Sequence, residues 1–250
     1  MLSGAFFAML ATQATGSPYI GVLAGVIAGL VLAMLQGGLT VLLAADQVVV
    51  GTGANLLALG VTGSLFRSRF GQSGQLLSIP RLDSWHGVDA VIVFLALSIP
   101  AIWWLLYRTS WGLSLRACGE YPRAVEAAGY SVNSIRLQAL AFSGLFGGLG
   151  GAYLAVGVAG SFAENMTFGR GFVAIAMVTF GRWNPYWAVA AALVVGYAAS
   201  LQFTLQARSV AAPHQLFVAL PYIIALLVLV IAGKGTLVPR ALGVAYRKER

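Results

Sequence analysis

The sequence predicts an all-α, polytopic membrane protein with about eight membrane helices or half-helices and one polar helix between them. Hydrophobic residues make up 59% of the 250 residues and charged residues only 9%, which leaves too little polar surface to cover a soluble domain of this length. The hydrophobic residues also form continuous runs long enough to cross a bilayer as helices, which takes about 20 residues each. A membrane barrel would instead show alternating strands of about 10 residues. We therefore expect one transmembrane domain over residues 1–250.

Six runs reach the length of a membrane-spanning helix, and they cover residues 19–37, 46–66, 89–107, 137–160, 186–203 and 214–232. Two shorter apolar stretches, residues 1–15 and 168–181, fall below that length. We expect an incomplete span at the first and a short or re-entrant helix, packed inside protein, at the second.

Four glycines within the run 137–160 are spaced for close contact between helix backbones: Gly144, Gly147, Gly148 and Gly151. Small residues at such spacing allow membrane helices to pack tightly. The alternative, a glycine-rich nucleotide loop, would need a preceding strand, and here the glycines lie inside an apolar helix. We interpret them as packing residues.

The basic residues indicate how the chain is oriented, because cytoplasmic loops carry the excess of Lys and Arg. If the loop over residues 108–136 faces the cytoplasm, ten of the 15 Lys and Arg residues lie on that side, and so does a basic tail over residues 233–250. The net charge of +8 is then a membrane-orientation signal. It does not indicate nucleic-acid binding, because no aromatic-interleaved basic patch gathers these residues.

Several kinds of chemistry are disfavoured by what the sequence lacks. It contains no phosphate-binding G-x-x-x-x-G-K-[ST] pattern, so we expect that the chain is not an enzyme and does not hydrolyse ATP. Its carboxylates lie at the ends of runs or in loops, which gives little support to ion coupling inside the bilayer. The lone Cys118 and the two distant histidines, His86 and His214, do not make a metal site.

The polar segment over residues 115–136 is the most informative part of the chain, and it predicts a short amphipathic cytoplasmic helix. Glu120, Pro122 and Arg123 are typical of a helix start, since an acid suits the positive end of the helix dipole and proline suits the first turn. The following residues favour a helix that stops at a glycine: Glu126, Ala127, Ala128 and Gly129. The small alanines at its end would let a partner approach closely; an ordinary solvated loop helix is the alternative.

The order LRACGEYPRAVEAAGYSV resembles the EAA-type coupling loop of ABC-transporter permeases, in particular those of the branched-chain amino acid, ribose and nucleoside importer family. Three further blocks carry the resemblance: MLSGA at residues 1–5, TVLLAADQVVVGTGANLLALG at 40–60, and FAENMTFGRGFVAIAMVT at 162–179, the last being similar to the nucleoside subgroup. The family's upstream helix and most of its first glycine-rich motif are missing, so we expect a shortened or misassigned N-terminus.

The resemblance implies a permease subunit in the inner membrane of a bacterium. The distribution of basic residues indicates that its C-terminus is cytoplasmic. The resemblance implies as partners a second permease subunit, which is a different, paralogous chain in the nucleoside subgroup, two ATPase subunits that bind ATP and magnesium, and an external solute-binding lipoprotein. This chain would hold no cofactor of its own, and its coupling residues would be those of the polar helix.

Candidate pathway residues are polar side chains in or beside the apolar runs. Asn55 lies mid-span, where an amide needs a partner or water; it lines the pathway or bonds a neighbouring helix. Gln47 lies nearer a span end, and Glu164, Asn165 and Arg170 flank the short helix on the outer side. These outer residues gate access or contact the binding protein, unless they are simply interfacial polar residues.

We expect nucleosides as the transported solute. A ribose or other simple-sugar importer, or a branched-chain amino acid importer, would keep the mechanism and change the solute. An ATP-independent facilitator or channel would dispense with the ATPases, and such a protein has no need of a coupling loop.

Overall fold

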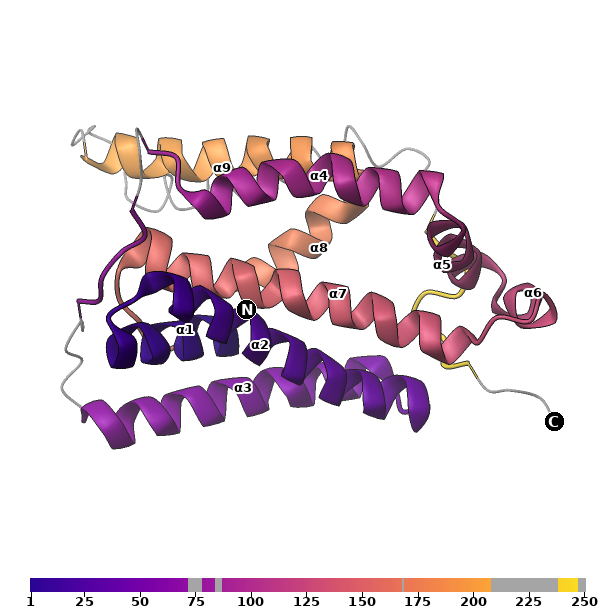
Figure 1. The fold of residues 1–250 in the computed structure, drawn as a ribbon, viewed down its shortest axis with the longest axis horizontal. Helices are drawn as coiled ribbons and strands as arrows, with labels where there is room; N and C mark the ends of the chain where they lie inside the picture. Colours follow the sequence, from indigo (N-terminus) through magenta and orange to yellow (C-terminus); the bar gives the residue numbers. More distant parts are fainter. Residues whose placement is uncertain (72–77, 84–86, 168, 208–237, 247–250) are drawn as a thin grey trace. The chain divides into compact units, whose positions relative to one another are not determined.

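The computed structural model describes residues 1–71, 78–83, 87–167, 169–207 and 238–246. Within these residues every regular element is helical, which confirms the predicted all-α class. The elements are α1 (Leu2–Thr15), α2 (Pro18–Gly37), η1 (Gly38–Leu42), α3 (Gln47–Phe70), α4 (Ala90–Arg108), α5 (Ser110–Glu120), α6 (Pro122–Ala127), α7 (Val132–Ala152), η2 (Tyr153–Ala159), α8 (Arg170–Phe180) and α9 (Pro185–Ala207) (Figure 1).

Among the described residues, four helices are long and apolar enough to cross a membrane: Pro18–Leu42, Gln47–Phe70, Ala90–Arg108 and Val132–Ala159. They coincide with the first four predicted spans. The fifth predicted span falls within α9, a helix of 23 residues, and the sixth, residues 214–232, lies outside the described residues. The two shorter stretches form α1 and α8, of 14 and 11 residues. Their lengths agree with the prediction, but α8 has no buried residue within the described part of the chain, so the expected packing inside protein is not seen for it.

Some predicted boundaries were wrong. α3 continues through Arg67 and Arg69 and ends at Phe70, before Gly71, which has a positive φ of 74°. Those two arginines lie in its last turn, where positive charge suits the helix dipole. The predicted loop over residues 108–136 is largely helical, because α5 follows α4 after the single residue Thr109, whose hydroxyl accepts from the N–H of Gly112 and so caps the new helix.

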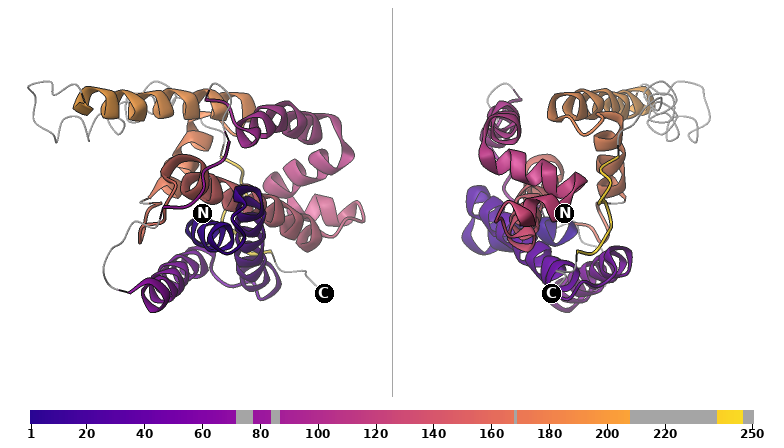
Figure 2. Two further views of the ribbon diagram at one scale, coloured as in Figure 1. Left: turned by 60° about the vertical axis from the view of Figure 1, so that its left-hand side comes forward. Right: turned by 90° about the vertical axis from the view of Figure 1, so that its right-hand side faces the viewer.

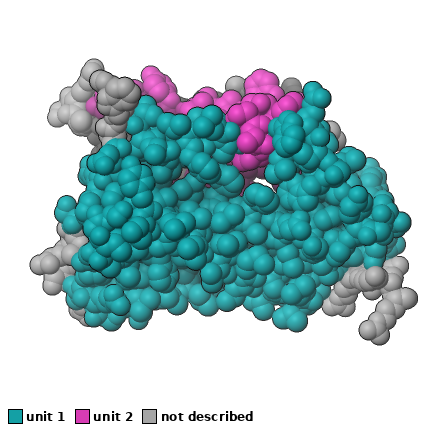
Figure 3. Space-filling model, in the orientation of Figure 1, with its two compact units in different colours: residues 1–98, 104–168, 240–250 teal, residues 99–103, 169–239 magenta. Residues whose placement is uncertain are grey.

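The chain divides into two compact units, coloured separately in Figure 3. Unit 1 comprises residues 1–98, 104–168 and 240–250, and its centre is α1, which is packed against both α2 and α7 (Figures 1 and 2). Phe6, Met9 and Thr12 of α1 are fully buried. A helix of 14 residues is too short to span a bilayer, so burying it inside protein satisfies its apolar surface.

Glycines let the three central helices approach one another. A methyl group added to Gly148 of α7 would lie 2.5 Å from the carbonyl oxygen of Gly25 of α2, and one added to Gly4 of α1 would lie 2.6 Å from the carbonyl oxygen of Gly148. Gly144 and Gly151 are also buried, as predicted for packing residues. The prediction was wrong for Gly147, where an added methyl would meet nothing within 4 Å.

Aromatic rings extend this core towards α3. The ring of Phe162 lies 5.3 Å from those of both Phe6 and Phe66, and tilted or edge-on aromatic pairs at such distances stabilise a fold beyond the area they bury. The segment that follows η2 is therefore anchored against α1 and α3, which fixes the neighbouring Glu164.

Unit 2 comprises residues 99–103 and 169–239, and its described helices are α8 and α9, which pack against each other. Trp103, near the end of α4, has its ring 5.8 Å from that of Tyr186 in α9. Pro100 lies inside α4, where it removes one helical hydrogen bond.

Candidate functional site

The predicted coupling helix exists as α6, Pro122–Ala127, with Pro122 in its first turn. Its end has the geometry of a Schellman motif: the N–H of Tyr130 donates to the carbonyl of Val125, and the N–H of Gly129 donates to that of Glu126. Gly129 has a φ of 86°, which a residue with a side chain adopts only under strain. The prediction that the helix stops at Gly129 is confirmed.

The prediction that Glu120 lies in the first turn of this helix was wrong. Glu120 is the last residue of α5, and α6 begins after Tyr121. The physical reason is that Glu120 belongs to a separate helix over Ser110–Glu120, which Thr109 caps. The charged and glycine-containing sequence of this segment did not predict that helix.

A small apolar cluster holds α5, α6 and the start of α7 together. It consists of Cys118, Val125, Val132 and Ile135, each buried, with Tyr246 packed against it. Burial raises the pKa of the Cys118 thiol, against the opposing effect of the Arg136 charge. Val125 thus faces inward and fixes which face of α6 is turned outward.

Four of the seven predicted coupling residues are exposed on α6 or directly after it. Arg123, Ala127, Ala128 and Gly129 are exposed, whereas Pro122 and Glu126 are half-buried. Glu126 accepts a hydrogen bond from the Tyr246 hydroxyl. The exposed alanines and glycine have small side chains or none, so a partner can approach the backbone closely at these positions.

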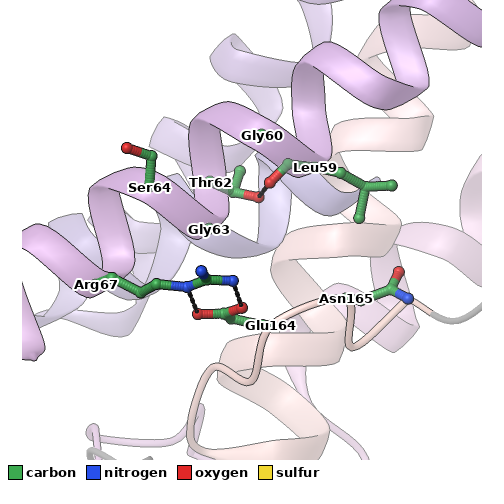
Figure 4. Close-up of a pocket in the computed structure, with 8 residues that line it drawn as sticks. All are labelled: Leu59, Gly60, Thr62, Gly63, Ser64, Arg67, Glu164 and Asn165. Atoms are coloured by element: carbon green, nitrogen blue, oxygen red, sulfur yellow. Dashed lines mark hydrogen bonds and ion pairs between the residues drawn. The ribbon is translucent and has the colours of Figure 1, made fainter. Parts of the chain in front are cut away.

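A second candidate site is a pocket of about 450 Å³ in unit 1, between α3 and the segment after η2 (Figure 4). It is lined by Leu59, Gly60, Thr62, Gly63, Ser64, Arg67, Glu164 and Asn165. Arg67 and Glu164 form a bidentate ion pair across it, with N–O distances of 2.8 and 2.7 Å. Paired parallel bonds of this kind fix orientation as well as charge.

The ion pair lowers the pKa of Glu164, chiefly through the hydrogen bonds from Arg67. Glu164 is therefore charged at neutral pH, and the pair weakens only as the pH falls through this lowered pKa. We expect Arg67→Gln to move the Glu164 pKa back up towards its ordinary value, whereas Arg69→Gln, an exposed residue of the same turn, leaves it low. Carbon NMR of labelled glutamate measures the Glu164 pKa, and the Glu164→Gln protein identifies its signal. Equal Glu164 pKa values in the wild-type, Arg67→Gln and Arg69→Gln proteins would contradict the ion pair.

The structure brings together only two of the five predicted pathway residues. Glu164 and Asn165 line the pocket. Asn55 is exposed on α3, one turn before Leu59, and its side chain makes no hydrogen bond to the described part of the chain. Gln47 is the first residue of α3, about 18 Å along the helix from Leu59, and Arg170 begins α8 in unit 2.

The sequence interpretation missed Arg67, Thr62 and Ser64 as pocket residues. Arg67 follows the last residue of the predicted span 46–66, so the apolar pattern does not mark it as a pathway residue. The one sequence signal for the ion pair was the presence of opposite charges at the ends of two apolar runs. This signal does not identify the partners, because 97 residues of sequence separate Arg67 from Glu164.

The two candidate sites lie at opposite ends of the same membrane helix. The continuous helix Val132–Ala159 has 28 residues, which corresponds to roughly 40 Å. α6 immediately precedes it and Glu164 follows it. A bilayer core of about 30 Å fits between the two sites.

The long apolar helices define a multi-pass membrane protein. Residues 1–233 match the protein family described as the permease component of the branched-chain amino acid transport system. The chain belongs to this family and is a permease subunit.

Among curated proteins, the chain is 32% identical to the guanosine ABC transporter permease protein NupQ of Bacillus subtilis, over all of this chain and 86% of the relative. It is 31% identical to the nucleoside ABC transporter permease protein NupC of Lactococcus lactis, over 94% of this chain and 79% of the relative. The putative glucose ABC transporter permease protein TsgC13 of Haloferax volcanii is 30% identical, over 84% of this chain and 68% of the relative. No solved structure matches the chain significantly.

Proposed function

We propose that this permease subunit belongs to an ABC importer for nucleosides in the inner membrane of a bacterium. The family and its named relatives support an ABC permease, and the two relatives named for guanosine and for nucleosides support the solute. The observation that carries the mechanism is the end of α6, where the exposed Ala127 and the two exposed residues that follow the helix, Ala128 and Gly129, offer a docking surface at one end of a membrane-spanning helix.

In this proposal the partner subunits supply the energy, the rest of the pathway and the delivery of the solute. Two cytoplasmic ATPase subunits with ATP and magnesium dock on α6, a second permease subunit completes the pathway, and an external lipoprotein delivers the solute. Closure of the ATPases on ATP moves α6 and the attached α7, and so favours one of two arrangements of the spanning helices.

The sidedness follows from the two sites. With α6 in the cytoplasm, the pocket at Glu164 and Asn165 faces outward, where it can receive the solute. The segment over residues 240–246 contacts α5, α6 and α7, which supports a cytoplasmic C-terminus as well. Asn55, Gln47 and Arg170 remain candidate pathway residues.

Uptake of labelled nucleosides into vesicles that hold the complete complex tests the solute. We expect ATP-dependent uptake of purine or pyrimidine nucleosides, with excess ribose, glucose or leucine failing to compete. ATP-driven uptake of a sugar alone would favour the second candidate, a simple-sugar importer, which the resemblance to TsgC13 supports. Uptake of leucine alone would place the chain with amino acid importers.

A further inference from the structure

A segment near the end of the chain lies across the helices that form the proposed docking surface. We define the C-terminal strap as residues 240–246, which belong to unit 1. In Figure 1 it is the yellow trace beside α5 and the start of α7. More than 100 residues of sequence separate the strap from each residue to which it bonds there. Arg136 and Val244, for example, are 108 residues apart.

The strap first fixes the end of α5. The N–H of Ala241 donates to the carbonyl of Gly119, at 2.9 Å, in the last turn of α5, where carbonyls lack a partner within the helix. The Arg240 guanidinium donates to the Tyr121 hydroxyl, at 2.5 Å, and lies 5.4 Å from the centre of that ring. Tyr121 is the single residue between α5 and α6.

The strap then reaches α6 and α7 through Tyr246. Its hydroxyl donates to the carboxylate of Glu126 in α6, and its ring packs against the buried cluster around Cys118. Arg136 of α7 lies 6.0 Å from the centre of this ring and donates to the carbonyl of Val244, at 2.9 Å. One short segment therefore bonds to all three helices.

α6 needs such support, because it has only six residues and isolated helices shorter than about 12 residues are marginal in water. Val125 is its one buried side chain. A helix held so weakly would shift or unfold under load rather than transmit a movement to α7.

We propose that the C-terminal strap locks the coupling helix α6 in its docking position, with Tyr246 as the positioning residue. The strap makes the C-terminus part of the energy-coupling apparatus. This inference rests on the proposed function for its role in transport, but the lock itself does not depend on any ATPase.

Cys118 allows the lock to be tested without transport. It is the one cysteine of the sequence, is only 3% exposed, and lies in the cluster that Tyr246 covers. In membranes that hold the full chain without its ATPases, we expect Tyr246→Ala to raise the rate of Cys118 modification by N-ethylmaleimide about tenfold or more, since opening of the cluster becomes easier. Leu242→Ala, which removes an exposed side chain of the same strap, is the matched control and should leave the rate unchanged.

The complete complex then tests the role in coupling. We expect Tyr246→Ala to raise the ATP hydrolysed per nucleoside imported about fivefold or more, and Tyr246→Phe, which keeps the ring but loses the bond to Glu126, to restore part of the coupling. A Cys118 rate in Tyr246→Ala within twofold of wild type would overturn the lock. A raised Cys118 rate with wild-type coupling would overturn its role in transport, and absence of ATP-driven uptake in wild type would instead count against the proposed function.

Discussion

Replacing Ala127 by arginine is expected to abolish ATP-driven uptake while the chain still folds and enters the membrane. Ala127 is exposed on α6, so a long side chain is tolerated in the isolated subunit. In a docked complex the same side chain must fit into a close contact between small residues. Overpacking costs about 1–3 kcal/mol and burying an unpaired charge about 3–5 kcal/mol. With the charge buried, that is a loss of roughly 100-fold to several thousand-fold in affinity for the ATPase.

Two measurements check this expectation: co-purification of the ATPase with the permease, and nucleoside uptake by the reconstituted complex. Ser134→Arg is the control, because Ser134 is exposed in the first turn of α7 but lies outside α6. We expect the Ser134→Arg protein to keep both ATPase binding and nucleoside uptake. Normal ATPase binding by the Ala127→Arg protein would show that α6 is not the docking helix.

Gly148→Ala is expected to destabilise the fold, because the added methyl would lie 2.5 Å from the Gly25 carbonyl oxygen and 3.0 Å from the Cα of Val26. These are backbone atoms, so the helices themselves must separate. Overpacking of this kind costs about 1–3 kcal/mol, which lowers Tm by roughly 2–12 °C for a chain of this size.

Gly147→Ala is the matched control one residue earlier, where an added methyl meets nothing within 4 Å. Alanine favours a helix over glycine by about 1 kcal/mol, so this variant should melt at the same temperature as wild type or slightly higher. Thermal unfolding in detergent, monitored as the loss of the monodisperse species, measures both effects. We expect a lower Tm for Gly148→Ala and an unchanged or slightly higher Tm for Gly147→Ala. Equal effects of both substitutions would contradict close packing at Gly148.

Hydropathy predicted the spans because a bilayer imposes a minimum length on each apolar helix, and the first four predicted spans coincide with helices of spanning length. It did not locate helix ends, because charged residues such as Arg67 and Arg69 can continue a helix beyond the apolar run. α5 was missed for a related reason: only Thr109 separates it from α4, so no loop composition marks the break.

The local parts of the candidate sites were also predictable. Pro122 and Gly129 mark the ends of α6 through backbone preferences that act within one turn. Gly147 was assigned to the packing face by its spacing, although a one-residue step rotates a helix by about 100° and turns it away from the face of Gly148.

The long-range contacts could not be derived from the sequence. Arg67 and Glu164 are 97 residues apart, and Tyr246 and Glu126 are 120 apart. Nothing in the local pattern of either pair specifies its partner, because such contacts result from the packing of whole helices. The ion pair and the strap therefore emerge only from the folded chain.

The central claim is that this permease subunit imports nucleosides with energy supplied by ATPases that act on α6. The most direct measurement compares nucleoside uptake by proteoliposomes of the complete complex, with and without ATP on the ATPase side. We expect uptake against a concentration gradient with ATP and none when a non-hydrolysable analogue replaces it. Nucleoside flux that continues at the same rate without ATP would contradict the account and identify a facilitator.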